Sequence, residues 1–284
     1  MPSPDTPVSP AAASTAAALS QLLAAHRSIR QYDTQRDVPE ALLDAALVEA
    51  FQGSSSSGNL NMSSVIVTRD PVRKQRLYEL HGEQPMVLQA PVVLTFCADT
   101  HRTRAWLAQR GARLGFAEFV SWHVAAFDAV IFAQSAALAL ESQGLGICYM
   151  GTTLFAMRAL AAELACPPQV LPVTSLVVGW PTEAPPQRDR LPASAWLHRE
   201  VYTPPDAAQI DADYARRDER GWARYRAGVP EVVKRMDEAG ITSLAQFYTS
   251  KLKYDPDRLG EFAADLHRLL VEQGFLAAEV PTAE

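Results

Sequence analysis

Cysteine is scarce in this sequence. The 284 residues contain three cysteines, at positions 97, 148 and 166, and none of them forms a CxxC pair. Disulfide scaffolds and structural zinc sites both depend on even numbers or close spacings of cysteine. The sequence therefore argues against both, predicts no metal site, and favours a reducing, cytoplasmic compartment.

An excess of positive charge is also missing. Lys and Arg together number 26 against 32 Asp and Glu, which gives a net charge of -6. Proteins that bind nucleic acid usually present a dominant basic face. No nucleic-acid partner is expected, and local basic clusters stand out against the acidic background.

A long run of uninterrupted apolar residues is absent too. The most hydrophobic stretch, residues 116–140, contains Glu118, His123, Asp128 and Gln134, whereas a membrane span needs about 20 mostly apolar residues. The stretch predicts a helix buried in a large core or at a subunit interface, and no membrane. We interpret His123 as a core or interface residue, because no second ligand follows it at metal spacing.

Basic residues are concentrated in the segment His26–Arg30, which reads HRSIR. Helical patterns over residues 16–25 and 39–51 predict that this segment connects two helices. Arginine offers a planar fork of donors that matches phosphate or carboxylate, and Ser28 adds a hydroxyl. The segment is either an anion site or a solvated basic turn.

Two further loops are candidates for ligand binding. Residues 53–61 place four consecutive serines between two glycines, and such a loop is either a flexible linker or a ligand-wrapping loop rich in donors. Residues 188–190 form a second basic cluster, Arg-Asp-Arg, with prolines on both sides. Those prolines favour a preorganised, extended contact with an anion.

The remaining pattern alternates strands and helices. Apolar, β-branched runs predict strands at 64–68, 91–98, 147–150 and 173–179, and periodic runs predict helices at 71–80, 116–143 and 154–164. Residues 99–115 are polar and predict a surface excursion. Neither a GxGxxG nor a GxxxxGK[ST] motif is present, so a doubly wound dinucleotide domain and a P-loop enzyme are not supported.

Six stretches in order carry a resemblance to a known family. They are HRSIR, SSSSGNLNMSS, GEQPMVLQAPVVLTFCAD, LGLGICYMG, LPVTSLVVGWP and RDRLP. In these motifs the chain resembles the nitroreductase-like flavoproteins, and within them the NADPH-dependent, oxygen-insensitive nitroreductase and flavin reductase branch. The resemblance implies an FMN-binding domain at 16–205. A disordered tail is expected at 1–15, and a helical extension at 206–284 that packs on the core or on a partner subunit.

The resemblance implies an α+β fold, in which a mixed, mainly antiparallel sheet is wrapped by helices in an intertwined homodimer. The resemblance also implies that FMN binds at the dimer interface. The first motif would hold the FMN phosphate and pyrimidine edge, the serine loop would border the flavin, a glutamine would bond the isoalloxazine, a strand end would lie near N5, and the second basic cluster would reach the phosphate. The matching positions are His26, Arg27, Ser28, Arg30, Ser55, Ser56, Ser57, Asn59, Asn61, Gln84, Tyr149, Met150, Gly151, Arg188 and Arg190.

The implied activity is two-electron, ping-pong reduction of nitroaromatics, quinones, flavins or similar small acceptors. NADPH would be the donor, with NADH as the alternative, and no catalytic side chain is needed because the flavin carries the hydride. Two other interpretations remain: a specialised flavoenzyme of the dehalogenase or flavin-fragmenting type, and a flavin-binding protein without turnover. This chain departs from the family motif at Thr152, which replaces a glycine, and at the inserted Gly58-Asn59.

Overall fold

The computed structural model describes residues 10–276 of the chain. It forms two compact units, Met1–Pro186 with Leu266–Glu284, called the core unit here, and Gln187–Asp265, called the helical unit. The chain enters the helical unit at residue 187, whereas the sequence places the change of composition at 206.

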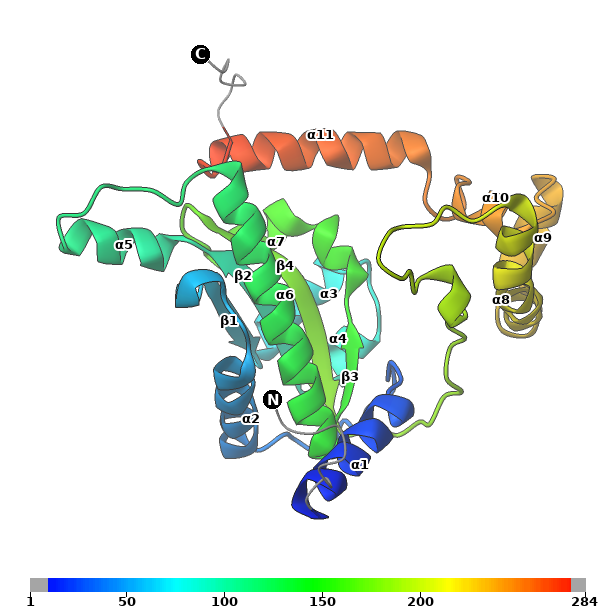
Figure 1. The fold of residues 1–284 in the computed structure, drawn as a ribbon, viewed down its shortest axis with the longest axis horizontal. Coiled ribbons are helices and arrows are strands. Elements are labelled where there is room, and N and C mark those ends of the chain that lie inside the picture. The colour runs from blue at the N-terminus through cyan, green and yellow to red at the C-terminus, as the bar shows by residue number, and fades with distance from the viewer. Residues whose placement is uncertain (1–9, 277–284) are drawn as a thin grey trace. The chain divides into compact units, whose positions relative to one another are not determined.

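The core unit is built on one antiparallel sheet (Figure 1). Its strands are β1 (Ser63–Thr68), β2 (Val92–Asp99), β3 (Gly146–Tyr149) and β4 (Val170–Gly179), in the order β1-β2-β4-β3. Every pair of neighbouring strands in the described residues is antiparallel. All eight residues of β2 are buried, which explains its nearly continuous apolar sequence. The α+β fold class is confirmed.

Helices cover both faces of this sheet. On one face, α2 (Glu40–Gly53) and α6 (Phe119–Ser142) pack against alternate residues of the central strands, among them Leu94 and Val178. On the other face, α3 (Pro71–Leu80), α4 (Met86–Gln89) and α7 (Met157–Glu163) pack with the intervening residues, among them Val93 and Val177. The period of two along each strand divides the core into these two layers.

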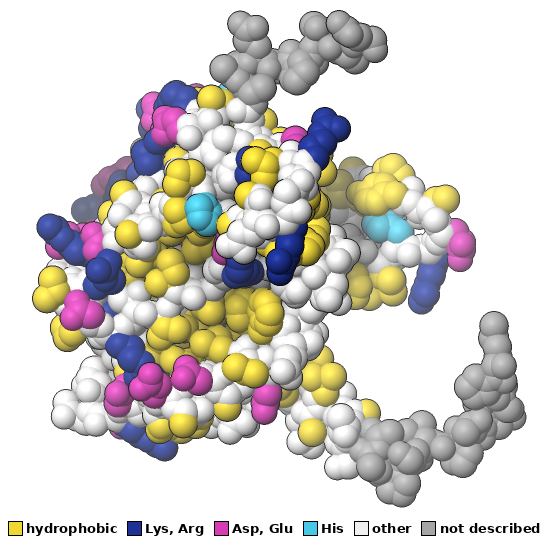
Figure 2. All heavy atoms as spheres, turned by 90° about the vertical axis from the view of Figure 1, so that its left-hand side faces the viewer, with side chains coloured by type: hydrophobic (Ala, Val, Ile, Leu, Met, Phe, Trp, Pro, Cys, Tyr) yellow, Lys and Arg dark blue, Asp and Glu magenta, His cyan; other side chains and the backbone are white. Residues whose placement is uncertain are grey.

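Helix α6 is long enough and apolar enough to cross a membrane, and no other helix among the described residues is. It lies across the sheet instead, as a core helix does (Figure 1). Small alanine side chains on its buried face let its backbone approach the strands. Large apolar residues on the same helix are exposed: Phe119, Val120, Phe127, Val130 and Ile131. Hydrophobic side chains also gather on the side of the core unit that Figure 2 presents.

Two predicted segments differ from the structure. Helix α1 (Pro10–Ala25) begins inside the predicted tail, so disorder is wrong for residues 10–15, while residues 1–9 lie outside the described residues. The alanine-rich sequence there favours helix. Helix α5 (His101–Gln109) occupies the predicted polar excursion. The Asp99 carboxylate accepts from the Arg102 backbone N–H at its start, a capping contact that hydrophobic periodicity does not reveal.

The helical unit has a small core of its own. It contains the 3₁₀ turn Ala193–Ala195, α8 (Ala207–Gly228), α9 (Pro230–Glu238), α10 (Leu244–Tyr248) and the first part of α11 (Pro256–Glu272). Its buried residues include Met236, Leu244 and Phe247. The end of α11 returns to the core unit, where Leu269 and Leu270 pack with Met157 and Leu171. Packing of the helical unit on the core or on a partner stays a prediction.

Candidate functional site

The HRSIR segment runs along the edge of the sheet. The backbone N–H of Ile29 donates to the carbonyl of Ile147 in β3 at 2.9 Å, and Tyr32 bridges to Pro181. Gly146 permits this approach, because a Cβ atom there would lie 2.8 Å from Ile29 Cγ1. The segment is therefore fixed to β3, and the interpretation as a freely solvated turn is wrong for its backbone.

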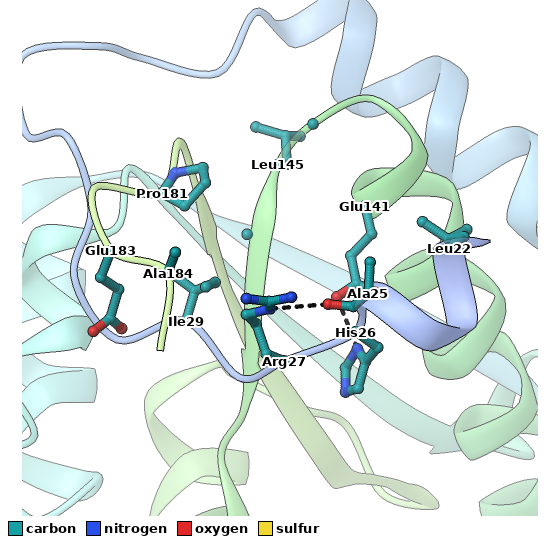
Figure 3. Close-up of a pocket in the computed structure, with 12 residues that line it drawn as sticks. Leu22, Ala25, His26, Arg27, Ile29, Glu141, Leu145, Pro181, Glu183 and Ala184 are labelled. Atoms are coloured by element: carbon teal, nitrogen blue, oxygen red, sulfur yellow. Dashed lines mark hydrogen bonds and ion pairs between the residues drawn. The ribbon is translucent and has the colours of Figure 1, made fainter. Parts of the chain in front are cut away.

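His26 and Arg27, the first two predicted site residues of this segment, line a pocket of about 290 Å³ (Figure 3). His26 Nδ1 lies 2.8 Å from Oε1 of Glu141, whose side chain is only 10% exposed. Burial raises the pKa of Glu141, and the contact with His26 opposes that rise. Arg27 Nε donates to the carbonyl of Ala25 at 3.0 Å. Because Glu141 and Glu183 also line this pocket, anion binding by His26 and Arg27 stays a prediction.

The remaining predicted site residues of the segment, Ser28 and Arg30, lie beside β3. Burial raises the pKa of the Cys148 thiol, while the charge of Arg30 and a hydrogen bond with Ser28 oppose that rise. The Arg30 guanidinium is exposed and donates to the carbonyl of Ser28 at 3.4 Å. Its charge therefore lies beside the strand that leads to Tyr149.

The serine loop is fixed to the long core helix. Ser56 Oγ donates to the buried carboxylate of Asp128 at 2.6 Å and accepts from the backbone N–H of Asn61 at 2.8 Å. The same carboxylate oxygen accepts from the Met62 backbone N–H at 3.1 Å. These bonds contradict the interpretation as a flexible linker.

The rest of this loop faces outward. Ser55 and Ser57 are exposed, and the two asparagines adopt positive φ angles of 55° for Asn59 and 54° for Asn61. Asparagine tolerates this left-handed region better than most residues. The Asn61 side chain donates to the carbonyl of Asn59 at 2.9 Å, which closes the turn on itself.

Gln84 and the end of β3 meet in the structure. Gln84 Nε2 donates to the carbonyl of His81 at 2.9 Å and to the hydroxyl of Thr152 at 3.4 Å. Thr152 directly follows the predicted residues Tyr149, Met150 and Gly151, so the two parts of the candidate site lie together although about seventy positions separate them. Within this part, Met150 is buried and Gly151 is exposed.

Two residues at this point were absent from the predicted cofactor contacts. His81 is fully buried, and its Nδ1 lies 2.8 Å from Thr152 Oγ1. Burial lowers the pKa of His81 to about 4. The sequence signals Thr152 only as a departure from the family motif, and it gives no signal for His81.

The second basic cluster belongs to the helical unit. Asp189 Oδ1 accepts from Arg220 Nη1 at 2.7 Å and lies 3.5 Å from Arg216 Nε, while Arg190 donates to the carbonyl of Arg188. The core unit and the helical unit are described separately. A phosphate contact from Arg188 and Arg190 therefore stays a prediction.

The donor set of the core unit fits a ligand rich in acceptors. It combines the exposed guanidinium of Arg30, the exposed hydroxyls of Ser55 and Ser57 and the exposed backbone of Gly151, and the half-buried amide of Gln84 adds an acceptor oxygen. A phosphate, hydroxylated chain and ring carbonyls, as FMN has, match cationic and neutral donors of these types. The residues present fit the cofactor that the resemblance implies.

Comparisons with known proteins identify the family of this chain. The model of the nitroreductase family matches residues 23–180. The FMN reductase [NAD(P)H] of Bacillus subtilis is 37% identical over 179 residues, 62% of this chain and 71% of the relative. The oxygen-insensitive NADPH nitroreductase of Salmonella typhimurium is 36% identical over 186 residues, 66% of this chain and 75% of the relative. A solved structure of a putative oxidoreductase from Bacteroides fragilis superposes with a TM-score of 0.80 at 35% identity, covering 90% of this chain and all of that one.

Proposed function

The chain belongs to the nitroreductase family, and from this premise we propose that it takes hydride from NADPH, or from NADH, and reduces small-molecule acceptors. It is an FMN-dependent oxidoreductase, and its relatives include enzymes named FMN reductase (NADPH) and oxygen-insensitive NADPH nitroreductase. One observation supports the proposal most directly. Gln84 and the segment Tyr149–Gly151 match separate motifs of the family, and the hydrogen bond from Gln84 to Thr152 brings them together at the end of the strand that holds the HRSIR segment.

We propose that the donors of the core unit hold FMN. Bound FMN would supply hydride transfer, and the protein would supply orientation and electrostatics. Arg30 would attract the anionic parts of the cofactor, Ser55 and Ser57 would donate hydrogen bonds from their hydroxyls, and Gln84 would accept a hydrogen bond from the ring through its amide oxygen. No side chain here needs to act as a general acid or base.

The acceptors that we propose are nitroaromatics, quinones, flavins and metal oxyanions. This range follows the names of the relatives, which include a nitroreductase, flavin reductases and a Cr(VI) reductase. An open site that accepts several oxidants needs no dedicated substrate contacts. We place the enzyme in the cytoplasm, where NADPH and reduced thiols are both maintained.

We further propose that the enzyme is a homodimer. Helix α6 exposes large apolar side chains, with Phe127 at 56% and Val130 at 46% exposure, and such surfaces on soluble proteins mark interaction sites. Light scattering should find a dimer for the natural protein and a monomer for Phe127→Arg. Val72→Arg is the matched control, because Val72 is also exposed but lies on α3. A monomeric natural protein would contradict this part of the proposal.

A visible absorption spectrum tests the proposed activity directly. Protein purified with FMN should show flavin absorbance, and NADPH added without air should bleach it. A nitroaromatic or a quinone should then restore the colour. Protein that binds FMN without bleaching would be a flavin-binding protein without this turnover or a specialised flavoenzyme. Protein that cannot bind FMN would contradict the proposal altogether.

A further inference from the structure

The hydroxyl of Thr152 is held by two side chains from another part of the chain. Thr152 lies in the 3₁₀ turn η2 (Gly151–Leu154), whereas His81 caps the end of α3 and Gln84 precedes α4. Thr152 Oγ1 is 2.8 Å from His81 Nδ1 and 3.4 Å from Gln84 Nε2. His81 is fully buried, while Gln84 and Thr152 are both partly exposed. The three residues thus form a polar network that begins in the core and ends at the surface.

The orientation of the glutamine amide follows from its partners. Gln84 Nε2 lies 2.9 Å from the carbonyl of His81, and a carbonyl can only accept a hydrogen bond. The amide nitrogen must therefore face that carbonyl. Its second proton is left to donate to Thr152 Oγ1, so the threonine hydroxyl acts as an acceptor toward Gln84.

The tautomer of the histidine decides where the threonine proton goes. Burial lowers the pKa of His81 to about 4, so the ring is neutral at pH 7 and carries one proton. Its Nε2 is buried without a hydrogen-bond partner in the described part of the chain. A proton on Nε2 would be an orphaned buried donor, and orphaned donors are rarer than under-used acceptors. The proton is therefore on Nδ1 and is donated to Thr152.

With both neighbours donating, the hydroxyl of Thr152 accepts twice and keeps its own proton for a third partner. The residues described in the structure offer no such partner. Because Thr152 follows the exposed Gly151 and touches Gln84, we propose that its hydroxyl donates a hydrogen bond to the isoalloxazine edge of bound FMN. His81 is then a positioning residue that fixes the direction of this donor.

This inference rests on the proposed function, and it adds the Thr152 hydroxyl of this chain as a group that adjusts the midpoint potential of FMN. The family motif has a glycine where Thr152 stands, and glycine carries no hydroxyl. A hydrogen bond strengthens when its acceptor gains negative charge. A donor to a ring oxygen, which gains negative charge when the flavin is reduced, should therefore favour the reduced cofactor over the oxidised one and raise the midpoint potential.

Replacing Thr152 by valine tests this inference, because valine keeps the shape and removes the hydroxyl. We expect Thr152→Val to bind reduced FMN about tenfold less favourably relative to oxidised FMN. This change lowers the midpoint potential by about 30 mV for a two-electron couple. Thr152→Ser retains the hydroxyl and should stay near the natural potential. The readouts are the midpoint potential, measured against reference dyes, and the visible spectrum of bound FMN.

His81 offers a second pair of variants, which serves where Thr152→Val loses its cofactor. His81→Asn keeps a donor near the Nδ1 position and should preserve the potential, whereas His81→Leu removes it and should lower the potential. Equal potentials and spectra for the natural protein, Thr152→Val and His81→Leu would overturn this inference and leave the proposed function intact. Failure of the natural protein to bind FMN would overturn both.

Discussion

The burial of His81 should make the folded protein sensitive to mild acid. Its pKa falls from the ordinary 6.5 to about 4 in the folded state, because the imidazolium would have to be buried. At pH values between about 4 and 6.5, His81 is protonated in the unfolded chain and neutral in the folded chain. The free energy of unfolding is therefore at its full value above pH 6.5 and decreases as the pH falls toward 4.

The size of the effect follows from the two pKa values. Between pH 7.5 and pH 5 the His81 contribution to the free energy of unfolding should fall by about 2 kcal/mol, since each pKa unit corresponds to roughly 1.4 kcal/mol. Other groups, such as Glu141, also titrate, so the comparison needs a matched variant. His81→Asn keeps polar contact with Thr152 and does not titrate.

Urea denaturation at several pH values measures this difference. Both proteins should be compared at one protein concentration and one FMN concentration, because cofactor binding and assembly add to apparent stability. The natural protein should lose about 2 kcal/mol more than His81→Asn between pH 7.5 and pH 5. Stability curves that run parallel over this range would show that His81 is protonated in the folded state or is not buried.

Three further predictions concern the residues that hold the site in shape. Arg30→Ala should weaken FMN binding about 10- to 100-fold, because a charge-assisted hydrogen bond contributes roughly 1.5–3 kcal/mol; an unchanged dissociation constant in fluorescence titration would remove Arg30 from the site. Asp128→Asn should speed hydrogen exchange in the serine loop and lower the free energy of unfolding by about 1–3 kcal/mol, since a neutral amide oxygen accepts the bonds from Ser56 and Met62 more weakly than the carboxylate oxygen does; protection equal to that of the natural protein would contradict the anchoring role. Gly146→Ala should destabilise the protein by roughly 1–3 kcal/mol, because its new methyl group would meet Ile29, whereas Gly53→Ala has nothing within 4 Å and serves as the control. Equal denaturation midpoints for these two alanine variants would show that the HRSIR segment can move away from β3 at little cost.

Much of the fold could be predicted from local sequence. Continuous apolar residues identified β2, and Asp70 before Pro71 predicted the start of α3, where the Asp70 side chain accepts from a backbone N–H. Helix α5 was missed because hydrophobic periodicity gives little signal in so polar a segment. Local patterns fail where a tertiary contact or a short capping bond decides the structure.

The candidate site shows the same limit. The motifs predicted that HRSIR, the serine loop and Gln84 belong to one site, and the structure joins Gln84 to the end of β3. They could not predict that His26 pairs with Glu141, 115 positions away, or that Asp128 anchors Ser56. These carboxylates lie on α6, whose sequence predicts burial, and the partner of a buried carboxylate is set only when the helix is packed on the sheet.

The hydroxyl of Thr152 and the imidazole of His81 depend on each other for a hydrogen bond. Adding a hydroxyl at a glycine position beside a cofactor introduces a donor and an acceptor that both need partners. Gln84 and His81 supply donors to its acceptor side, and the buried, neutral imidazole does so without adding charge to the site. Without Thr152, the Nδ1–H group of His81 would be buried without an acceptor. Without His81, the hydroxyl of Thr152 would have no fixed direction. The pair instead gives a rotating hydroxyl one orientation, which is the property that a donor to a cofactor requires.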